Sequence, residues 1–429
     1  MKSSDWAEIS VFLGALYLGL LNLKCWLSLR VVLKDRRSSK AGIHEAGSAD
    51  RGSRSNDTFP SVTVAVPILS GDPLLSEKLC STARTIAAID ATICVIWLVD
   101  ESDLTGQQIV LELKQLFSIG RMVVCPDAPS DVNPKSYKLQ IALDAATSEF
   151  FVVIDDDTTI DAPAILQAIR AMKHCDLYTG LPCYQSDGRF WSRLLATFVN
   201  NNAAITYLPL LNFFPPISIN GMFYIVRTER WRDIGGYTAI LQELCDDYAV
   251  RRHAAGFHWR VTQGLTAQRL QTSVNGPRHY FSLMHRWMLF ATLLIQDQRL
   301  PVRLLMIVLL GIPPFIFCGV AGTAAVSLLM GGHWEGMSRS SFIAALCLML
   351  TARHFVIVAV HRTVFPFRSA IHPGISILSE LLQPLHAVHA ICRRTIRWRS
   401  RVIQVVRGNR FRILNSSSVL KTADSGITE

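Results

Sequence analysis

The chain has 429 residues, half of them apolar, with a mean hydropathy of +0.28 and a formal net charge of +10. This length accommodates a sizeable domain together with further segments, and the hydropathy is high for a soluble enzyme. The positive charge lies beside apolar runs, which is typical of membrane proteins, so we expect no nucleic-acid partner. Ten cysteines occur without C-x-x-C or His/Cys spacing, which argues against a zinc site or a disulfide framework.

The first apolar run, residues 9–32, predicts a membrane span within an N-terminal anchor at residues 1–34. It contains Lys24 and Arg30, and no small-x-small cleavage site follows it, so we predict an uncleaved anchor rather than a signal peptide. Basic residues flank its C-terminal side and place that side in the cytoplasm. Residues 35–60 are rich in Ser, Gly and charge, and predict a flexible linker.

From residue 61 the pattern changes to alternating strands and helices. The predicted elements are a strand at 62–68, a helix at 77–89, a strand at 93–99, a helix at 107–117, a strand at 122–125, a helix at 137–147 and a strand ending at Asp155. This order predicts a mostly parallel sheet with helices on both faces, in an α/β domain at 61–300. Residues 190–216 are apolar but irregular, and fit a membrane-facing surface, an acceptor channel wall or an ordinary core.

Three adjacent carboxylates, Asp155, Asp156 and Asp157, follow a buried strand. Like charges so close raise one another's pKa, so the cluster calls for a positive partner. A divalent metal carrying a phosphate would supply it, because hard cations take carboxylate and phosphate oxygens together. Ligands of parallel sheets bind at the carboxyl ends of strands, where Pro67 and Asp100 also lie. A solvated acidic turn is the alternative.

The C-terminal part begins with two further apolar runs, residues 304–330 and 341–360, which predict an outward-and-back membrane hairpin joined by the loop 331–340. Residues 375–391 are apolar but contain Glu380, and we predict an interfacial or re-entrant segment that completes a region at 301–392. Residues 393–429 form a basic tail with a disordered end, whose arginines fit attraction to anionic lipid headgroups.

Four motifs follow one another in the α/β domain. They are Val99-Asp100-Glu101-Ser102, Asp155-x-Asp157, Gly235-Gly236-Tyr237 with Glu243-Leu244-Cys245-Asp246-Asp247, and Leu283-Met284-His285-Arg286-Trp287. In this order, with a membrane hairpin after them, they resemble the membrane-bound inverting nucleotide-sugar glycosyltransferases of the family 2-like superfamily, which includes cellulose, chitin and hyaluronan synthases. Leu283 stands where that family has Gln or Arg, which weakens an assignment to polymer synthesis.

Further segments narrow the resemblance to the ceramide glucosyltransferase branch. They are Val64-Ala65-Val66-Pro67, Gly71-Asp72-Pro73, Val132-Asn133-Pro134-Lys135, Gly180-Leu181-Pro182 and, in the tail, Ile396-Arg397-Trp398-Arg399. The resemblance implies a glycosyltransferase-A fold, which is a nucleotide-diphospho-sugar transferase domain of Rossmann-like α/β type. It also implies an N-terminal transmembrane anchor and C-terminal transmembrane helices.

The resemblance also implies roles for individual residues. Asp247 is the expected general base, and Asp155 and Asp157 are expected to bind Mg²⁺ or Mn²⁺ at the donor diphosphate. The expected donor-binding residues are Pro67, Asp100, Lys135, Asp156, Arg286 and Trp287, and the expected acceptor-side residues are Gly235, Gly236 and Asp246.

Each of these roles has a structural alternative. Asp100 fits an ordinary strand-end turn, and Lys135 fits a solvated surface position. Asp246 and Asp247 fit the first turn of a helix, where the dipole favours acids. Arg286 and Trp287 fit an interfacial pair ahead of a membrane span.

The resulting hypothesis is a multi-pass membrane enzyme that transfers a hexose with inversion from a UDP-sugar, UDP-glucose, to a lipid hydroxyl such as that of ceramide. Its catalytic domain faces the cytoplasm, at a bacterial inner membrane or at the Golgi or ER. Transfer to a hopanoid-type lipid or diacylglycerol and polysaccharide synthesis are alternatives. A non-catalytic lipid-binding scaffold or transporter subunit is the alternative from another class.

Overall fold

The computed structural model describes residues 2–49, 59–89, 93–117, 119–330, 337–365, 371–398, 401–405 and 409–414. Contacts divide the chain into two compact units, each built from separated segments. The helical unit contains Met1–Ala41, Tyr184–Phe214 and Thr272–Cys392, and the α/β unit contains Gly42–Cys183, Pro215–Gln271 and Arg393–Glu429. The predicted domain at 61–300 is therefore shared between the two units.

The α/β unit is built on a mixed sheet whose strands are ordered β3-β2-β1-β4-β7-β6-β8-β5. The strands are β1 (Val62–Pro67), β2 (Cys94–Asp100), β3 (Arg121–Cys125), β4 (Phe150–Ile154), β5 (Thr158–Thr159), β6 (Leu177–Ser186), β7 (Phe223–Arg227) and β8 (Val261–Thr272). Neighbouring strands among β1 to β4 pair in parallel, as predicted. The β4–β7, β6–β7 and β5–β8 pairs are antiparallel. This direction was not predicted, because apolar runs predict strands but not their direction.

Both faces of this sheet are buried, and the side chains of each strand alternate between two cores. In β2, Val95 and Trp97 enter one core while Ile96 and Leu98 enter the other. The first core is covered by α2 (Leu75–Ala87), α3 (Leu104–Leu116) and α5 (Ala162–Ala171). The second is covered by α4 (Pro134–Ala145), α8 (Thr228–Asp233), the short η2 (Thr238–Ile240) and α9 (Asp246–Gly256). The predicted helix-covered α/β architecture is confirmed.

The C-terminal tail contributes a small antiparallel sheet to the α/β unit. Its strands are β9 (Thr395–Trp398), β10 (Arg401–Val405) and β11 (Phe411–Leu414). The tail is therefore more than a basic extension, although residues 415–429, for which disorder was predicted, lie outside the described residues, as do Arg399 and Arg407.

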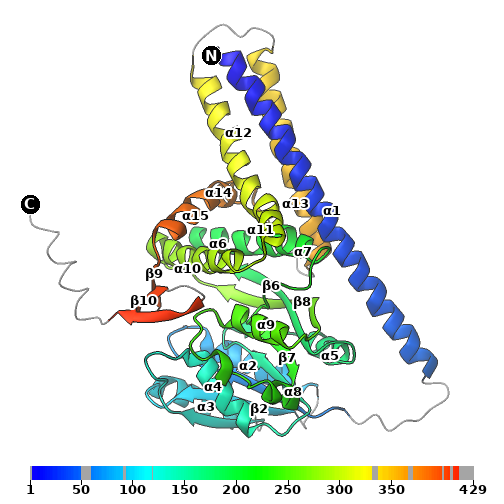
Figure 1. Ribbon diagram of the computed structural model, residues 1–429, viewed down its shortest axis with the longest axis vertical. Helices are drawn as coiled ribbons and strands as arrows, with labels where there is room; N and C mark the ends of the chain where they lie inside the picture. The colour runs from blue at the N-terminus through cyan, green and yellow to red at the C-terminus, as the bar shows by residue number, and fades with distance from the viewer. Residues whose placement is uncertain are drawn as a thin grey trace, which may run out of the picture. The chain divides into compact units, whose positions relative to one another are not determined.

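The helical unit collects helices from three parts of the chain (Figure 1). They are α1 (Ser3–Ala49), α6 (Phe190–Asn201), the π-helical η1 (Asn202–Tyr207), α7 (Leu208–Leu210), α10 (Pro277–Gln296), α11 (Leu300–Met306), the π-helical η3 (Ile307–Gly311), α12 (Ile312–Leu329), α13 (Arg339–Val364), α14 (Pro373–Leu381) and α15 (Gln383–Cys392). Helix α1 continues to Ala49, beyond the boundary at residue 34 where a linker was predicted. Residues 50–58 of that linker lie outside the described residues.

Four helical stretches of the described residues are long and apolar enough to cross a membrane. They are Ser3–Arg37, Leu300–Leu329, Arg339–Val364 and Pro373–Cys392. The first three match the predicted spans, although the second ends one residue before the predicted boundary at Met330. Most of the predicted hairpin loop, residues 331–336, lies outside the described residues. The fourth stretch is interrupted between α14 and α15, where Pro384 lies in the first turn of α15. Its predicted interfacial position stays a prediction.

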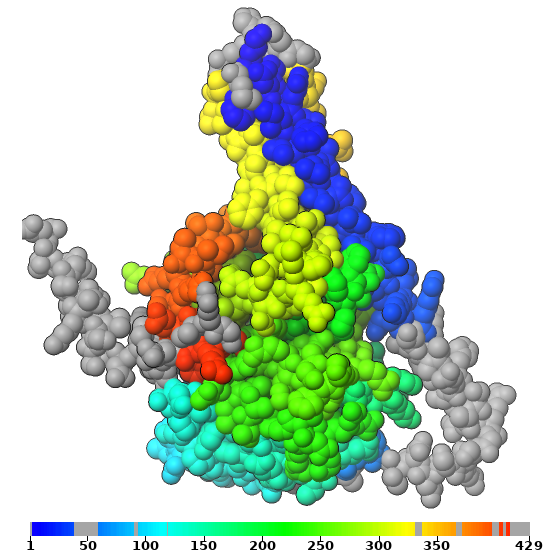
Figure 2. All heavy atoms as spheres, viewed as in Figure 1, coloured from blue at the N-terminus to red at the C-terminus, as the bar shows by residue number. Residues whose placement is uncertain are grey.

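Helix α1 packs along α12 and α13 through small and polar residues. Ser10 donates a hydrogen bond from Oγ to the carbonyl oxygen of Val320 at 3.2 Å, and Gly14 lies against the sulfur of Met349. Figure 2 shows the blue surface of α1 lying directly against the yellow surface of α12. Small residues allow such close approach of apolar helices, which have no hydrophobic driving force between them in lipid.

A buried ionic network ties three of these helices together. Arg353 of α13, whose side chain is 1% exposed, pairs with Glu380 of α14 at 2.7 Å. The same guanidinium donates to the hydroxyl of Tyr17 on α1 at 2.9 Å and to Oγ of Ser376 at 3.2 Å. Ionisable groups among apolar helices are costly unless they are paired, so this network fixes how α1, α13 and α14 pack together.

The sequence left residues 190–216 open between a membrane-facing surface, a channel wall and a domain core; residues 190–214 belong to the helical unit, and the last two belong to the α/β unit. Helix α6 packs against α14, and Lys24 of α1 donates to Oγ1 of Thr206 in η1 at 3.1 Å. Helix α10 packs along α15, where the Tyr280 hydroxyl lies 3.2 Å from Nε2 of His386. Amphipathic helices inside the predicted domain thus bury their apolar faces against the apolar helices near the two ends of the chain.

Replacing Arg353 by Ala should destabilise the helical unit, because it leaves the Glu380 carboxylate buried without its cation. We expect a loss of about 3–5 kcal/mol, measured by thermal unfolding in detergent. The matched control is Arg362→Ala, an exposed position on the same helix, for which we expect a change of about 0.5 kcal/mol or less. An unchanged Tm for Arg353→Ala would contradict the role of the network.

Candidate active site

Three polar or turn-forming residues lie together where parallel strands end. Pro67 closes β1, Asp100 closes β2 and Asp155 directly follows β4. Strands β2 and β4 both pair in parallel with β1, so these carboxyl ends share one edge of the sheet, as predicted. Pro67 is buried and in register with Leu98, and its donor-binding role stays a prediction.

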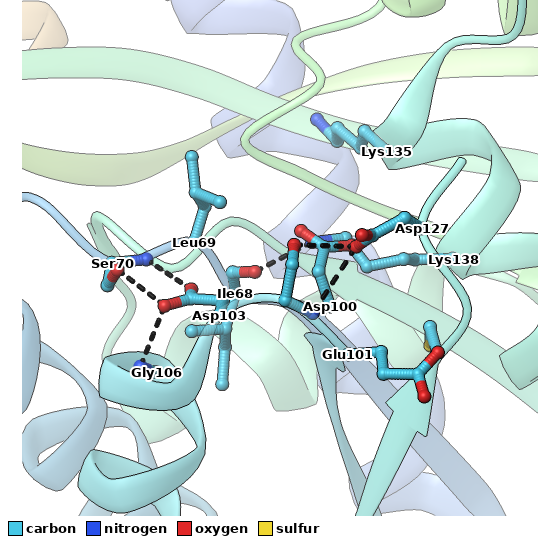
Figure 3. A network of polar contacts seen from close by, with 12 residues as sticks. Ile68, Leu69, Ser70, Asp100, Glu101, Asp103, Gly106, Asp127, Lys135 and Lys138 are labelled. Atoms are coloured by element: carbon cyan, nitrogen blue, oxygen red, sulfur yellow. Dashed lines mark hydrogen bonds and ion pairs between the residues drawn. The ribbon is translucent and has the colours of Figure 1, made fainter. Parts of the chain in front are cut away.

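Asp100 is paired with a lysine that the sequence did not single out. Lys138 of α4, with 4% of its side chain exposed, contacts Oδ2 of Asp100 at 2.9 Å and donates to the carbonyl oxygen of Ile68 at 2.7 Å (Figure 3). Lys138 follows Lys135 by three residues on the same helix, which places both on one face. Two lysines on one helix face, in a chain whose strands end in aspartates, were the sequence signal that could have identified Lys138.

Two further aspartates hold the loop after β1. Asp103 accepts hydrogen bonds from the backbone N–H of Ser70 at 2.8 Å and from Gly106 at 2.9 Å, where it caps α3 (Figure 3). Burial opposes its ionisation, but these bonds and that of the Ser70 hydroxyl lower the pKa of Asp103 below its usual value. Asp156 accepts from the N–H of Leu69 at 2.7 Å. The structure therefore gives Asp156 a contact with this loop, and its donor-binding role stays a prediction.

Lys135 lies at the centre of the candidate site. Asn133 caps α4 and Pro134 occupies its first turn, so Lys135 leaves the helix near its start. Its Nζ lies 2.7 Å from Oδ1 of Asp155 and 3.0 Å from Oδ2 of Asp246. Burial alone would lower the pKa of Lys135, but the charges of these aspartates raise it well above the ordinary value. Lys135 therefore stays charged and is not a solvated surface lysine.

Asp155 and Asp157, separated by one residue, are the two carboxylates expected to bind a metal ion. Burial raises the pKa of both carboxyls, and Asp157 raises that of Asp155 further, while Lys135 lowers both. Lys78, which pairs with Asp72 at 2.5 Å, also lowers the pKa of Asp157.

The donor set at these carboxylates fits a divalent ion that is shared with a substrate. In the described part of the chain, no group of three His, Cys, Asp or Glu side chains is arranged to hold a metal. Mg²⁺ commonly takes only one or two protein carboxylates, with phosphates and water as its other ligands. Two hard, partly buried carboxylates match that pattern, and they do not form an all-protein metal cage.

Asp247, in the first turn of α9, has the environment of a general base. The N–H of Gly221 bonds to its carboxylate, and a Cβ at Gly221 would overlap Oδ1 of Asp247, so this position requires glycine. Burial and the neighbouring charge of Asp246 raise the pKa of Asp247 to about 7, against the opposing charge of Lys135. A carboxyl with a pKa near the working pH is suited to accept a proton.

Gly235 and Gly236 form the turn after α8, with φ values of +94° and +55°. A Cβ on Gly236 would collide with Leu143 of α4, so the turn packs closely on that helix. Next to it, Oε1 of Gln140 accepts the N–H of Tyr237 at 2.8 Å. These contacts give the glycines a role in holding the segment on α4, and their acceptor-side role stays a prediction.

Arg286 and Trp287 lie on α10 of the helical unit. Trp287 contacts Tyr184 edge to face, with ring centroids 5.9 Å apart. Their donor-binding role stays a prediction.

Comparison with known proteins identifies the family. A model of glycosyl transferase family 21 matches residues 29–411. The chain belongs to glycosyl transferase family 21. This family 21 member is therefore a glycosyltransferase, as the ordered aspartate motifs predicted. A search of curated proteins found no matching sequence.

A solved glycosyltransferase shares the fold of this family 21 chain, and two others match it with lower TM-scores. The mannosyltransferase PcManGT from Pyrobaculum calidifontis, in complex with GDP-Man and Mn²⁺, is 15% identical with a TM-score of 0.52, covering 90% of this chain and 98% of that chain. TarS 1-349 from S. aureus, in complex with UDP-GlcNAc, is 14% identical with a TM-score of 0.35, covering 83% and 99%. Glucosyl-3-phosphoglycerate synthase from Mycobacterium tuberculosis, with Mn²⁺, UDP and phosphoglyceric acid, is 15% identical with a TM-score of 0.33, covering 53% and 78%. The similarity to PcManGT confirms the predicted fold class.

Replacing Lys138 by Ala should destabilise the α/β unit. The change leaves the carboxylate of Asp100 and the carbonyl of Ile68 without the cation that satisfies them, so we expect a loss of about 3 kcal/mol in thermal unfolding. Lys114→Ala, an exposed lysine on α3, is the matched control and should leave the Tm nearly unchanged. Equal Tm values for the two variants would show that Lys138 is dispensable for the strand edge.

Proposed function

We propose that this family 21 glycosyltransferase transfers glucose from UDP-glucose, with inversion, to the hydroxyl of a membrane lipid, ceramide. The observation that carries the proposal is the position of Lys135. It bridges Asp155 to Asp246, next to Asp247, and so brings a candidate metal carboxylate and a candidate base to one point. A displacement at a sugar carbon needs two such groups close together. One holds the metal that receives the leaving diphosphate, and the other takes the proton of the acceptor hydroxyl.

The donor would bind along the strand edge. Lys138 holds one carboxylate oxygen of Asp100, and the other oxygen would accept a hydrogen bond from the nucleoside. Asp155 and Asp157 would hold a Mg²⁺ or Mn²⁺ ion, which supplies neutralising charge for the diphosphate as it leaves. Lys135, which stays protonated, adds a fixed positive charge beside the same carboxylates.

The chemical step is a single displacement. The acceptor hydroxyl oxygen attacks the anomeric carbon of the sugar while a carboxylate oxygen of Asp247 takes the hydroxyl proton. The bond between that carbon and the diphosphate oxygen breaks, its electron pair leaves with UDP, and the configuration at the carbon inverts. Burial raises the pKa of Asp247, the charge of Asp246 raises it further, and the charge of Lys135 lowers it.

The helical unit supports a lipid acceptor. It contains the four stretches of the described residues that are long and apolar enough to cross a membrane. A membrane-embedded lipid presents its hydroxyl at the headgroup level, so a transferase anchored by such helices can receive it laterally from the bilayer. We propose that the donor and the α/β unit lie on the cytoplasmic side, as the basic residues after the first span predict.

The reaction is tested by transfer of labelled glucose from UDP-glucose to ceramide in membranes, with the inverted anomer as the expected product. Asp247→Asn should lower kcat by about 10²–10⁴-fold, because the amide cannot accept the proton. Asp155→Ala should abolish the transfer activity that depends on Mg²⁺ or Mn²⁺. Asp233→Asn, an exposed position on α8, should be fully active. Full activity of Asp247→Asn would refute the assigned base, and transfer to diacylglycerol, a hopanoid or a growing polymer would refute the acceptor.

The pH dependence of turnover follows from the pKa of about 7 for Asp247. The base acts when ionised, so kcat should fall as the pH drops below 7 and reach a plateau above it. A pH–rate profile at saturating donor and acceptor measures this limb. A limb near the ordinary carboxyl value of about 4 would contradict the buried environment of Asp247.

A further inference from the structure

The segment that leads into α9 lacks the usual capping side chain. Cys245 occupies the N-cap position, and its thiol is only a weak hydrogen-bonding group. Ser, Thr, Asp or Asn at this position would normally accept the first free N–H groups. Asp246 and Asp247 follow immediately, so the orientation of their carboxylates depends on how the chain is held at residues 243–245.

One side of this segment is held from α4. Nδ2 of Asn133 donates to the carbonyl oxygens of Glu243 at 3.1 Å and Leu244 at 3.3 Å, and the N–H of Asn133 donates to Leu241 at 2.7 Å. Asn133 also caps α4 two residues before Lys135. The same asparagine thus positions the lysine and the segment that carries the acidic pair.

The other side is held by the C-terminal tail through Asn409. Its Oδ1 accepts the N–H of Cys245 at 3.0 Å, and its Nδ2 donates to the carbonyl oxygen of Cys245 at 3.1 Å and to Oε2 of Glu243 at 2.9 Å. Its backbone carbonyl accepts the N–H of Leu244 at 2.9 Å. Glu243 and Arg410 form an antiparallel bridge beside these bonds.

The burial and backbone conformation of Asn409 fit this contact and do not fit a solvent-exposed position. It is 2% exposed and adopts a φ of +65°, which asparagine tolerates better than most residues. Its amide contacts both the N–H and the carbonyl of one residue, in the manner of a paired strand, and these bonds use its donor and its acceptor. Glu243 is held further by an ion pair with Arg252 of α9, which fixes the carboxylate that Asn409 contacts.

We propose that Asn409 is a positioning residue for glycosyl transfer, and that the C-terminal tail completes the active site by clamping residues 243–245 against Asn133. This inference rests on the proposed function, because it gives the tail a task in orienting Asp246 and Asp247. It differs from attraction of the tail arginines to lipid headgroups, since the contacts belong to an uncharged, buried side chain. The tail follows the last apolar helix in the sequence, so the clamp also makes turnover depend on the chain beyond Cys392.

The test compares Asn409→Gly with Gln404→Ala in the full-length protein. Glycine removes the amide without straining the positive φ, and Gln404 is an exposed residue of β10 in the same small sheet. For Asn409→Gly we expect kcat for transfer from UDP-glucose to ceramide to fall about 10- to 100-fold, because small displacements of catalytic groups are costly. The KM for UDP-glucose should change less than about two-fold, because the donor-side contacts remain. Gln404→Ala should match the wild type in both.

A rescue separates orientation from general stability. Asn409→Asp places a carboxylate against Glu243 and should lower kcat by repulsion. Adding Glu243→Gln to that variant removes this repulsion and supplies an amide that can donate to the new carboxylate, so kcat should recover in part, because the carbonyl of Cys245 still lacks its donor and Arg252 loses its ion pair. Failure of the double variant to recover any activity would count against the clamp.

Hydrogen–deuterium exchange gives a readout that is independent of turnover. Peptides covering residues 243–250 should exchange faster in Asn409→Gly, while peptides from β1 should not change. A wild-type kcat of Asn409→Gly overturns the inference, whether its exchange is faster or unchanged. Either result leaves the proposed function standing. A wild-type protein that binds UDP with Mn²⁺ in calorimetry but transfers no sugar refutes the proposed function, and the inference falls with it.

Discussion

The pairing of Lys135 with Asp155 and Asp246 is the interaction on which the candidate site depends. Four carboxylates, Asp155, Asp157, Asp246 and Asp247, approach one another, and burial together with like charge drives the pKa values of Asp155, Asp157 and Asp247 upward. The ammonium of Lys135 lies between two of them, and Lys78 adds a second positive charge beside Asp157; these charges offset the repulsion within the cluster. Lys135 also lowers the pKa of Asp247, which stands at about 7. The charge that stabilises the folded cluster therefore also gives Asp247 a pKa suited to a general base.

The same rule governs charge elsewhere in the chain. Lys138 neutralises Asp100 at the strand edge, and Arg353 neutralises Glu380 among the apolar helices. A buried pair adds little net stability, because desolvation offsets the attraction, but removal of one partner is expensive. These pairs therefore act mainly as constraints on geometry: they set which strand ends and which helices can come together.

Much of the fold and part of the site could be predicted from local pattern. Apolar runs that end in Pro67, Asp100 and Asp155 predicted strands with a common polar edge, because parallel strands present their carboxyl ends together. The antiparallel pairing of β4 with β7 was not predictable in this way, since periodicity carries no information on strand direction. Lys138 and Asn409 were missed for a related reason. Each acts on residues distant in the sequence: Lys138 offered only its three-residue spacing from Lys135, and a lone asparagine in a basic tail does not differ locally from a solvated residue.

The sequence by itself determined the chemistry that is available: an ordered series of aspartates, apolar stretches long enough for a membrane, and membership of glycosyl transferase family 21. These properties reside in residue types and short spacings, which a linear pattern preserves. Only the tertiary structure decided which charge faces which, that the helices at 190–201 and 277–296 belong with the apolar helices, and that the tail returns to the turn before Asp246. Such contacts are set by burial and by the satisfaction of polar groups across long sequence separations, where the cost of leaving a charge or an amide unpaired selects one arrangement.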